Sequence, residues 1–348
     1  MRAVVFPDRN RIEVREMATP TVRAGHVLIK TYYTSISAGT ELRVLRGDLP
    51  AIARGEIRYP LVPGYENVGR VVAIGDGVVG LDEGAWVCSE GTASFREYAS
   101  CWGGHAEYVL ALANDVIALP ADLPPQHGLF TLLASIALHG VQRGRVALGE
   151  SVVIFGQGVV GLLSLQCARL AGADRVIVVD RLPTRLQVAQ HLGATATILI
   201  EDQTPRGLAD ALTQIQALTS NRGADVVLDA TGVTEVAAVA ARACRERGRL
   251  VLVGLYAQPL TFDYWDLYRR EIDILPSQGA GPKEEEALAR HRWTWRRTCE
   301  ESLTLITARR LAVDALITHH LPIDAIADGY EALRVAPDHT LKVVLAWQ

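Results

Sequence analysis

A glycine-rich hexapeptide, Gly156 to Gly161, has the residue types and spacing that bind the pyrophosphate of a dinucleotide. It directly follows the β-branched run VVIF and opens the apolar stretch GLLSLQCARLAG, the strand and helix context that the motif requires. Gly156 permits a tight turn, Gly158 lets the backbone approach a phosphate, and Gly161 allows helix and strand to pack closely. Val159 and Val160 begin a helix whose N-terminus attracts negative charge. The motif predicts a dinucleotide-binding site, with a purely structural glycine turn as the alternative.

An acidic residue, Asp180, ends the next apolar run, VIVVD. A carboxylate there can accept hydrogen bonds from the adenosine ribose diol and repels a 2′-phosphate, so the sequence favours NAD over NADP. Arg181 and Arg185 keep NADP open, because an arginine near the acid could pair with that phosphate; alternatively, both lie near the adenine or in solvent. Thr231 and Gly254 complete the predicted set of cofactor contacts.

Short apolar runs alternate with helical stretches through the middle of the chain. This alternation is typical of an α/β domain with a doubly wound parallel sheet, and six strands complete a dinucleotide-binding sheet. Pro183 at a first helical position and Gly193 after the last helical turn delimit one of the helices. The predicted strands cover residues 151–155, 175–179, 196–200, 224–229, 249–253 and 272–275.

The first 120 or so residues have a different pattern, in which apolar and polar residues alternate over 27–31, 67–74 and 105–111. Such alternation, with Gly and Pro between the stretches, predicts an antiparallel, barrel-like β domain. The tail returns to this style after a predicted helix over 292–307, with strands at 317–321 and 341–347 and a helix that has Pro322 in its first turn. We therefore expect one domain from residues 1–122 and 310–348 and a second, inserted domain from residues 123–309, with ligands in the cleft between them.

Composition excludes several classes of partner. Acidic residues number 39 against 35 Lys and Arg, a formal charge of −4, so no basic field for nucleic acid or anionic lipid is expected. The N-terminal residues are interrupted by Pro7 and Asp8 and do not form a signal-peptide core. No stretch approaches the roughly 18 uninterrupted apolar residues of a membrane span. We expect a soluble, cytoplasmic protein that acts on a small molecule.

The chain resembles the medium-chain dehydrogenase/reductase superfamily over its whole length. Besides the glycine-rich loop, the matching stretches are SAGTE at 37–41, VPGYENVG at 62–69, GAWV at 84–87, GGHAEY at 103–108 and ALHGV at 137–141. The resemblance implies a GroES-like β-barrel catalytic domain beside a Rossmann dinucleotide-binding domain. It also implies an NAD(P)-dependent oxidoreductase acting on CH–OH groups, usually assembled as a homodimer or homotetramer.

Members of this family commonly hold a catalytic zinc with a Cys, a His and a third Cys, Asp or Glu. The resemblance places Ala38, Tyr65 and Leu132 at these positions. A catalytic zinc needs about three protein nitrogen, sulfur or oxygen donors, and Ala and Leu offer none. The five cysteines contain no C-x-x-C pair, and the four-cysteine lobe of many relatives is missing. We expect neither a catalytic nor a structural zinc.

Within the superfamily, SISAGTELRVLRGDLP and YPLVPGYENVGRV are most similar to the zinc-free branch that includes the bacteriochlorophyllide dehydrogenases. Those enzymes oxidise a secondary alcohol on a tetrapyrrole substituent to a ketone. This similarity covers about the first 75 residues best. It implies a tetrapyrrole or another bulky alcohol as substrate.

Without zinc, hydride transfer still requires a group that moves the hydroxyl proton and one that stabilises a developing alkoxide. Thr40 matches the Ser or Thr that passes the proton in relatives. The alternative is that it is an ordinary threonine in a turn. Tyr65 could donate a hydrogen bond to the substrate oxygen or simply fill the vacant metal position. Glu66 is either a second acid or the buried partner of an arginine in the cofactor domain. His105, expected at the cleft mouth, is either an acid/base or a structural histidine.

Two other functions stay open from the sequence. Quinone and enoyl reductases of the same superfamily also lack zinc, but they usually prefer NADPH, and Asp180 disfavours that cofactor. A protein that binds NAD(P)H without catalysis is the other alternative, and the presence of Thr40 and Glu66 disfavours it.

Overall fold

The computed structural model describes residues 1–92, 95, 98–201, 204–282 and 293–348, and it divides the chain into two compact units. Unit 1 comprises Met1–Leu132 and Leu303–Gln348, and unit 2 comprises Leu133–Ser302. The sequence placed these boundaries at 122 and 309. Both observed boundaries fall within continuous helices, α3 (Thr131–Arg143) and α9 (Trp295–Thr307), where no linker composition marks them.

Unit 2 contains a six-stranded, wholly parallel sheet in the order β12-β11-β10-β13-β14-β15. This is the doubly wound arrangement that the sequence predicted, with the order reversing between β10 and β13. All six predicted strands are present, although β14 begins five residues before its predicted start, at Cys244 rather than at Arg249. The strands are β10 (Ser151–Phe155), β11 (Arg175–Asp180), β12 (Ala196–Leu199), β13 (Ala224–Asp229), β14 (Cys244–Leu252) and β15 (Asp273–Pro276).

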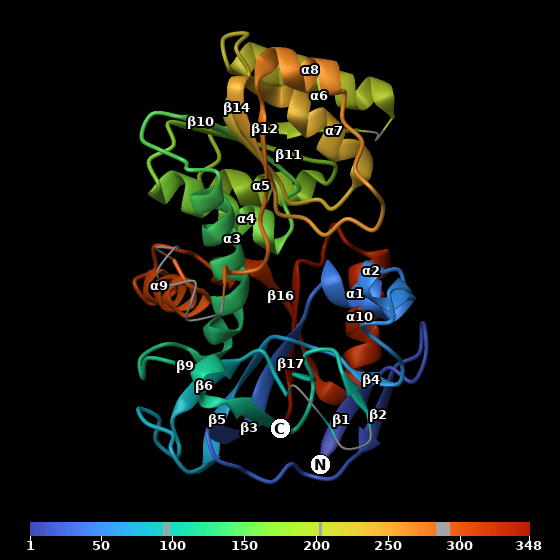
Figure 1. The fold of residues 1–348 in the computed structure, drawn as a ribbon, viewed down its shortest axis with the longest axis vertical. Helices are drawn as coiled ribbons and strands as arrows, with labels where there is room; N and C mark the ends of the chain where they lie inside the picture. The colour runs from blue at the N-terminus through green and yellow to red at the C-terminus, as the bar shows by residue number, and fades with distance from the viewer. Residues whose placement is uncertain (93–94, 96–97, 202–203, 283–292) are drawn as a thin grey trace. The chain divides into compact units, whose positions relative to one another are not determined.

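Helices cover both faces of this sheet, which is why its strands are buried runs of β-branched residues. Figure 1 shows α4 and α5 together on one side and α6, α7 and α8 together on the other. Pro183 is the first residue of α5, and Gly193 beyond its end has φ +99°, as the sequence indicated. The helices are α4 (Val159–Leu170), α5 (Pro183–His191), α6 (Pro205–Leu218), α7 (Thr234–Ala243) and α8 (Tyr264–Arg270).

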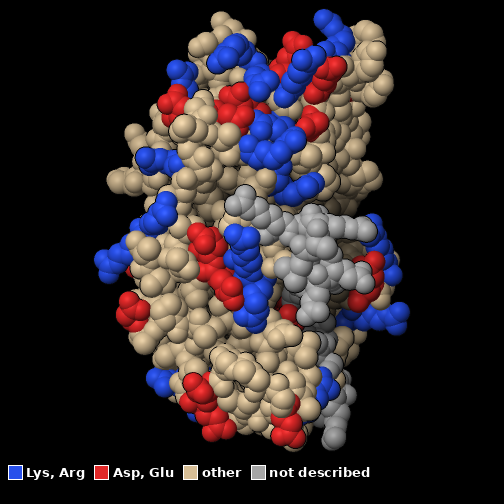
Figure 2. Space-filling model, turned by 60° about the vertical axis from the view of Figure 1, so that its left-hand side comes forward, with Lys and Arg blue, Asp and Glu red and all other residues tan. Residues whose placement is uncertain are grey.

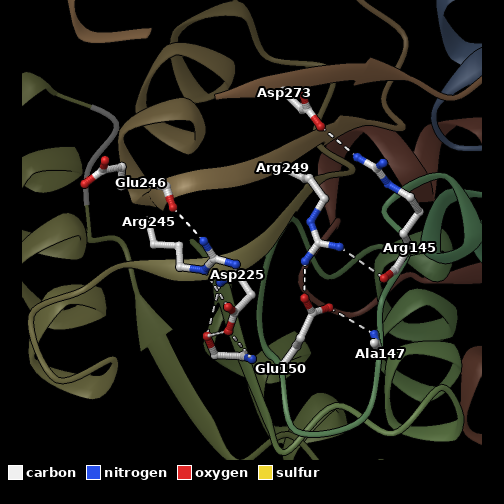
Figure 3. Close-up of polar contacts among 9 residues, drawn as sticks. Arg145, Ala147, Glu150, Asp225, Arg245, Glu246, Arg249 and Asp273 are labelled. Carbon is white, nitrogen blue, oxygen red and sulfur yellow. Dashed lines mark hydrogen bonds and ion pairs between the residues drawn. The ribbon is translucent and has the colours of Figure 1, made fainter. Parts of the chain in front are cut away.

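Ion pairs tie together the amino-terminal ends of the central strands (Figure 3). Glu150, just before β10, pairs with Arg249 of β14 and accepts the backbone N–H of Ala147 at 2.9 Å. Asp225 of β13 pairs with Arg245 of β14 at 2.6 Å. It also accepts a hydrogen bond from the Ser151 hydroxyl at 2.7 Å. The carboxylates of the first two pairs are largely buried, so the contacts fix the strand starts at the edge opposite the glycine-rich loop. A third, exposed pair joins Arg145 to Asp273 of β15 at 2.7 Å.

Unit 1 contains a seven-stranded, mostly antiparallel sheet built around the long strand β3 (His26–Ile36). β3 pairs with β17, β5 and β8, and the chain's tail adds β16 parallel to β17. The tail thus lies in unit 1, with α10 (Ile326–Val335) packed into the same core as Phe6, Ile36 and Leu345. The other strands of this sheet are β5 (Asn67–Ile74), β6 (Trp86–Ser89), β8 (Tyr108–Leu112), β9 (Val116–Ala118), β16 (Ile317–Pro322) and β17 (Lys342–Ala346).

Smaller elements complete unit 1. Two-stranded sheets join β1 to β2 and β4 to β7. The turn after β3 leads directly into α1, which positions the candidate catalytic residues. The bounds are β1 (Arg2–Val5), β2 (Glu13–Glu16), β4 (Leu61–Val62), β7 (Ala99–Ser100), α1 (Thr40–Arg46) and α2 (Pro50–Ala53), with short 3-10 helices at 113–115, 125–130, 314–316 and 323–325.

Charges of both signs are distributed over the surface. Figure 2 shows Lys and Arg interspersed with Asp and Glu over the face in view. Among the residues that the structure describes, no helix has the length and apolarity needed to cross a bilayer.

Candidate functional site

The glycine-rich loop connects β10 to α4 and has no room for side chains at two of its glycines. Gly156 has φ +86°, a left-handed conformation that glycine adopts without strain. A Cβ on Gly156 would lie 2.9 Å from Thr231 Cγ2, and one on Gly161 would lie 1.8 Å from the Gly156 carbonyl oxygen. Gly158 is the N-cap of α4, so the backbone N–H groups of Val159 and Val160 open the helix without intrahelical acceptors. The loop therefore presents backbone donors to an anion at a helix N-terminus.

Asp180 holds this loop from the end of β11. Its Oδ2 accepts the backbone N–H of Gln157 at 2.5 Å and its Oδ1 accepts that of Leu182 at 2.9 Å. Each carboxylate oxygen retains capacity for a second hydrogen bond, as a ribose hydroxyl would require. Arg181 is exposed, whereas Arg185 is half-buried with its Nη1 3.8 Å from the position of a Cβ on Gly158. Arg185 thus lies beside the phosphate-binding turn instead of in solvent.

The loops after β13 and β14 form the other side of the predicted dinucleotide site. The Thr231 hydroxyl donates to Asp229 Oδ1 at 2.6 Å, and Tyr256 donates to Asp229 Oδ2 at 2.8 Å. Burial raises the pKa of Asp229, which these donors counteract. Gly254 packs so closely that a Cβ would lie 2.3 Å from the Gly232 nitrogen. All the predicted cofactor residues therefore gather at the carboxyl edge of the sheet, where the strand order reverses.

Three hydroxyl groups meet at the start of α1 in unit 1. The phenol oxygen of Tyr65 is hydrogen-bonded to the Ser37 hydroxyl and to the side chain of Thr40. The Tyr65 ring is buried and packs edge-on against Trp102, with ring centroids 5.1 Å apart. Burial, together with the neighbouring charge of Glu66, raises the pKa of Tyr65 far above its usual value. The phenol is therefore a neutral hydrogen-bond donor at physiological pH.

His105 is fully buried in unit 1, so the expectation that it lies at the mouth of a cleft is wrong. Its Nε2 lies 2.9 Å from Glu41 Oε2, and its Nδ1 lies 2.9 Å from Thr34 Oγ1. The ring packs on Gly64, where a Cβ would approach its Cδ2 to 2.7 Å. Burial alone would raise the pKa of Glu41, but the His105 charge and hydrogen bonds from its neighbours lower it. Both ring nitrogens are thus engaged in a buried network.

Glu66 is also buried, and its partner is a lysine of unit 1 rather than the expected arginine of the cofactor domain. Its Oε2 pairs with Lys342 Nζ on β17 and accepts the Ser35 hydroxyl. Lys342 also donates to the Ile36 carbonyl at 3.3 Å. Burial raises the pKa of Glu66, although the lysine opposes this shift. This partner is not predictable from the sequence, because Lys342 lies in an apolar final strand where a buried cation is uncommon.

The positions that hold zinc in relatives do not fit a metal ion in this chain. Ala38 and Leu132 have no donor atoms, and Tyr65 is held by two hydroxyls. In the part of the chain that the structure describes, no three His, Cys, Asp or Glu side chains are grouped to hold a metal. All five cysteines are buried thiols.

Two residues of this site were not singled out from the sequence. Ser37 belongs to the family-like stretch at 37–41, and its place three residues before Thr40, in the same turn, is the signal that could have indicated it. Glu41 was likewise passed over, even though an acid in the first turn of a helix is a common stabilising feature.

Comparisons with known proteins agree with this architecture. Residues 23–121 match the alcohol dehydrogenase GroES-like domain family, and residues 159–292 match the zinc-binding dehydrogenase family. L-threonine 3-dehydrogenase from Bacillus subtilis is 29% identical over 92% of this chain and 91% of its own length. The uncharacterized zinc-type alcohol dehydrogenase-like protein YphC from Escherichia coli is 31% identical over 73% of this chain and 77% of its own length.

A solved structure also matches over nearly all of the chain. It is a putative zinc-binding dehydrogenase from Sinorhizobium meliloti bound to NADP, with a TM-score of 0.81, 25% identity and 99% of both chains covered. A likeness of this extent includes both units and the glycine-rich loop between β10 and α4.

Proposed function

The chain belongs to the medium-chain dehydrogenase/reductase superfamily and is an NAD(P)-dependent oxidoreductase acting on alcohols. We propose that it interconverts a secondary alcohol and a ketone without zinc. The observation that carries the proposal is the hydroxyl cluster of Ser37, Thr40 and Tyr65, which stands where relatives bind the metal. NAD is the proposed cofactor, supported by the carboxylate of Asp180.

In this proposal Tyr65 stabilises the substrate oxygen. A buried, protonated phenol donates a hydrogen bond to the carbonyl oxygen of a ketone or to the alkoxide that develops from an alcohol. Its high pKa, caused by burial and by the Glu66 charge, keeps the proton on the phenol in the resting enzyme. This donor stabilises developing negative charge, which is the task that a metal performs in zinc enzymes.

Thr40 is the proposed group that passes the hydroxyl proton. Its hydroxyl can donate and accept at the same time, and it is half-buried at the first residue of α1 beside Tyr65. During oxidation Thr40 Oγ1 accepts the proton of the substrate hydroxyl and releases its own hydroxyl proton to water. During reduction the relay runs in reverse, from water through Thr40 to the substrate oxygen. Glu66 is held by Lys342 and acts through its charge on Tyr65 rather than by proton transfer.

The cofactor would be held by residues of unit 2. The loop from Gly156 to Gly161 and the helix N-terminus bind the pyrophosphate, with Arg185 beside them, and Asp180 accepts the ribose hydroxyls. Bound NAD(H) supplies the hydride acceptor or donor. A 2′-phosphate would face the Asp180 carboxylate, which favours NAD over NADP.

The proposal extends to a bulky secondary alcohol such as a 1-hydroxyethyl group on a tetrapyrrole. Its support is the similarity of the SISAGTELRVLRGDLP and YPLVPGYENVGRV stretches to the zinc-free branch with such substrates. The first of these stretches contains Ser37 and Thr40 and the second contains Tyr65, so the similarity includes the hydroxyl cluster.

The test follows hydride transfer from stereospecifically deuterated NADH to acetophenone, and from 1-phenylethanol and haematoporphyrin to NAD. Thr40→Val should lower turnover by about 10²-fold or more, the scale of a lost acid/base group, while NADH affinity stays unchanged. Tyr65→Phe should lower it by about 10²- to 10³-fold, as for one lost oxyanion donor. Tyr59→Phe is the matched control, since the Tyr59 hydroxyl donates to the Val44 carbonyl elsewhere in unit 1.

Three outcomes would contradict the proposal. Deuterium transfer from NADPH to an enone or quinone, with none to ketones, would favour the reductase alternative. NADH binding without any transfer would favour a silent binding protein. Normal turnover of both Thr40→Val and Tyr65→Phe, together with loss in His105→Gln, would transfer the acid/base role to His105.

A further inference from the structure

We propose that Ser37 is a positioning residue that directs the phenolic proton of Tyr65 toward the substrate oxygen; this inference rests on the proposed function. The Ser37 hydroxyl is buried and hydrogen-bonded to the phenol oxygen of Tyr65. Because Thr40 bonds the same phenol oxygen, Tyr65 lies between two hydroxyl groups.

Either hydroxyl can donate in the Ser37–Tyr65 pair, and the number of protons decides which direction leaves the phenol available to a substrate. A phenol has one proton to donate and two acceptor lone pairs. If Tyr65 donated to Ser37, its proton would be unavailable to a substrate. If Ser37 donates to Tyr65, the phenolic proton is free to point to the substrate oxygen. A hydroxyl that donates to the phenol also lowers the pKa of Tyr65, which makes the phenol a stronger donor.

The Ser37 backbone is held in place from both sides. Its N–H donates to Glu41 Oε1 at 2.9 Å, and its carbonyl oxygen accepts the Glu41 N–H at 3.1 Å. The other Glu41 oxygen accepts from His105 at 2.9 Å and from the Tyr330 hydroxyl at 2.6 Å. Three segments that are distant in sequence, at 37–41, His105 and Tyr330, therefore converge to fix Ser37.

Trp102 contacts Tyr65, the other partner of the hydrogen bond with Ser37. It packs edge-on against the buried Tyr65 ring, with centroids 5.1 Å apart, which limits the movement of the phenol on this side. The geometry of the bond is thus set by Ser37 and the network behind it. Removal of the Ser37 hydroxyl leaves the phenol with Thr40 as its neighbour, and Tyr65 then donates to Thr40 for part of the time.

The expected effect of Ser37→Ala is a three- to tenfold fall in kcat, about the size of one neutral hydrogen bond. NADH affinity should not change, because the variant alters nothing in unit 2. In a Tyr65→Phe background the same substitution should cause no further loss, since no phenolic proton remains to be directed. Ser37→Thr, which keeps a hydroxyl, should retain most of the activity.

The experiment measures kcat and KM for acetophenone with NADH, and NADH affinity by fluorescence titration, for the wild type, Ser37→Ala, Tyr65→Phe and the double variant. Ser89→Ala is the matched control: Ser89 is buried in the same unit, and its hydroxyl has no hydrogen-bond partner among the residues that the structure describes. Loss of kcat in Ser37→Ala that disappears in the Tyr65→Phe background supports the proposal.

Two results overturn the role of Ser37 while leaving the proposed function intact. One is unchanged kcat in Ser37→Ala, and the other is an equal loss with and without the Tyr65 hydroxyl, as a purely structural role would give. A wild-type protein that transfers no hydride to any ketone overturns the proposed function and this role together.

Discussion

Replacing His105 with glutamine separates a structural role from a chemical one. The imidazole is fully buried, and each ring nitrogen lies 2.9 Å from an oxygen, one of Glu41 and one of Thr34. Glutamine has a similar size, but its single amide group cannot reproduce the two opposed ring nitrogens that contact Glu41 and Thr34. Leaving a buried acceptor without its hydrogen-bond donor costs about 1–3 kcal/mol, and more when the acceptor is charged. We therefore expect His105→Gln to lower the free energy of unfolding by about that amount at pH 7.

The pH dependence of this loss has a defined sign. In the wild type the pKa of Glu41 lies below its ordinary 4.5, because the His105 charge and hydrogen bonds outweigh burial. The pair thus stabilises the fold above that pH, and the stabilisation is lost as the pH falls through the folded-state pKa. Without His105, burial raises the pKa of Glu41, so protonation relieves the penalty. The difference between variant and wild type should shrink as the pH falls toward 4.5.

The assay is urea unfolding followed by far-UV circular dichroism at pH 7 and pH 4.5. Adding Glu41→Gln to His105→Gln should recover part of the lost stability, because no buried charge remains. His339→Gln is the matched control, since that histidine is exposed, and its unfolding free energy should stay within about 0.5 kcal/mol of the wild type. Unchanged unfolding in His105→Gln together with lost turnover would refute the structural role.

Three further predictions concern the metal and the cofactor. The purified chain should contain no stoichiometric zinc and should keep its activity in chelator, because the zinc positions lack donors; one tightly bound zinc per chain by elemental analysis would contradict this. Asp180→Ala should weaken NADH binding by about three- to tenfold per lost hydrogen bond and reduce discrimination against NADPH, measured by fluorescence titration; tighter NADPH binding by the unmodified protein would show the opposite preference. Gly161→Ala should weaken NADH binding at least about fivefold, because its Cβ would overlap the Gly156 carbonyl oxygen at 1.8 Å; unchanged affinity would mean that the loop can shift freely.

The parallel sheet was predictable because its signals are local. Each of its strands contains a short apolar run, and the turn residues beside the runs, such as Gly156 and Gly193, have the positive φ that their identity suggested. The start of β14 was missed because its first half, CRERG, is polar and pairs with β13 through an irregular register between Ala224 and Val226. The charged residues of that half give no apolar strand pattern, and the strand forms there through its pairing with β13.

The candidate site was only half predictable, because its contacts join segments that are distant in sequence. The family resemblance points to Tyr65 and Thr40, but the hydrogen bond between Ser37 and Tyr65 spans 28 positions and that between Glu41 and His105 spans 64. A sequence pattern predicts which side chains have suitable chemistry. It does not predict which of these side chains are buried with all their polar atoms engaged. For His105, this difference decides between an acid/base role and a structural role.

Glu41 illustrates why the fold must decide. A buried carboxylate requires donors or a cation, and the basic residues of its own helix, Arg43 and Arg46, lie two and five positions away, off the face that Glu41 presents. Its own segment supplies one donor, the Ser37 N–H on Oε1, and the partners of Oε2 come from two other segments, His105 and Tyr330. Because His105 and Tyr330 hold the Glu41 carboxylate, the Ser37 backbone that donates to it is fixed, and the Ser37 hydroxyl is directed to Tyr65. The site thus contains a buried carboxylate, Glu41, that takes no part in the chemistry. Glu41 and its partners hold in place the uncharged hydroxyl cluster that does take part.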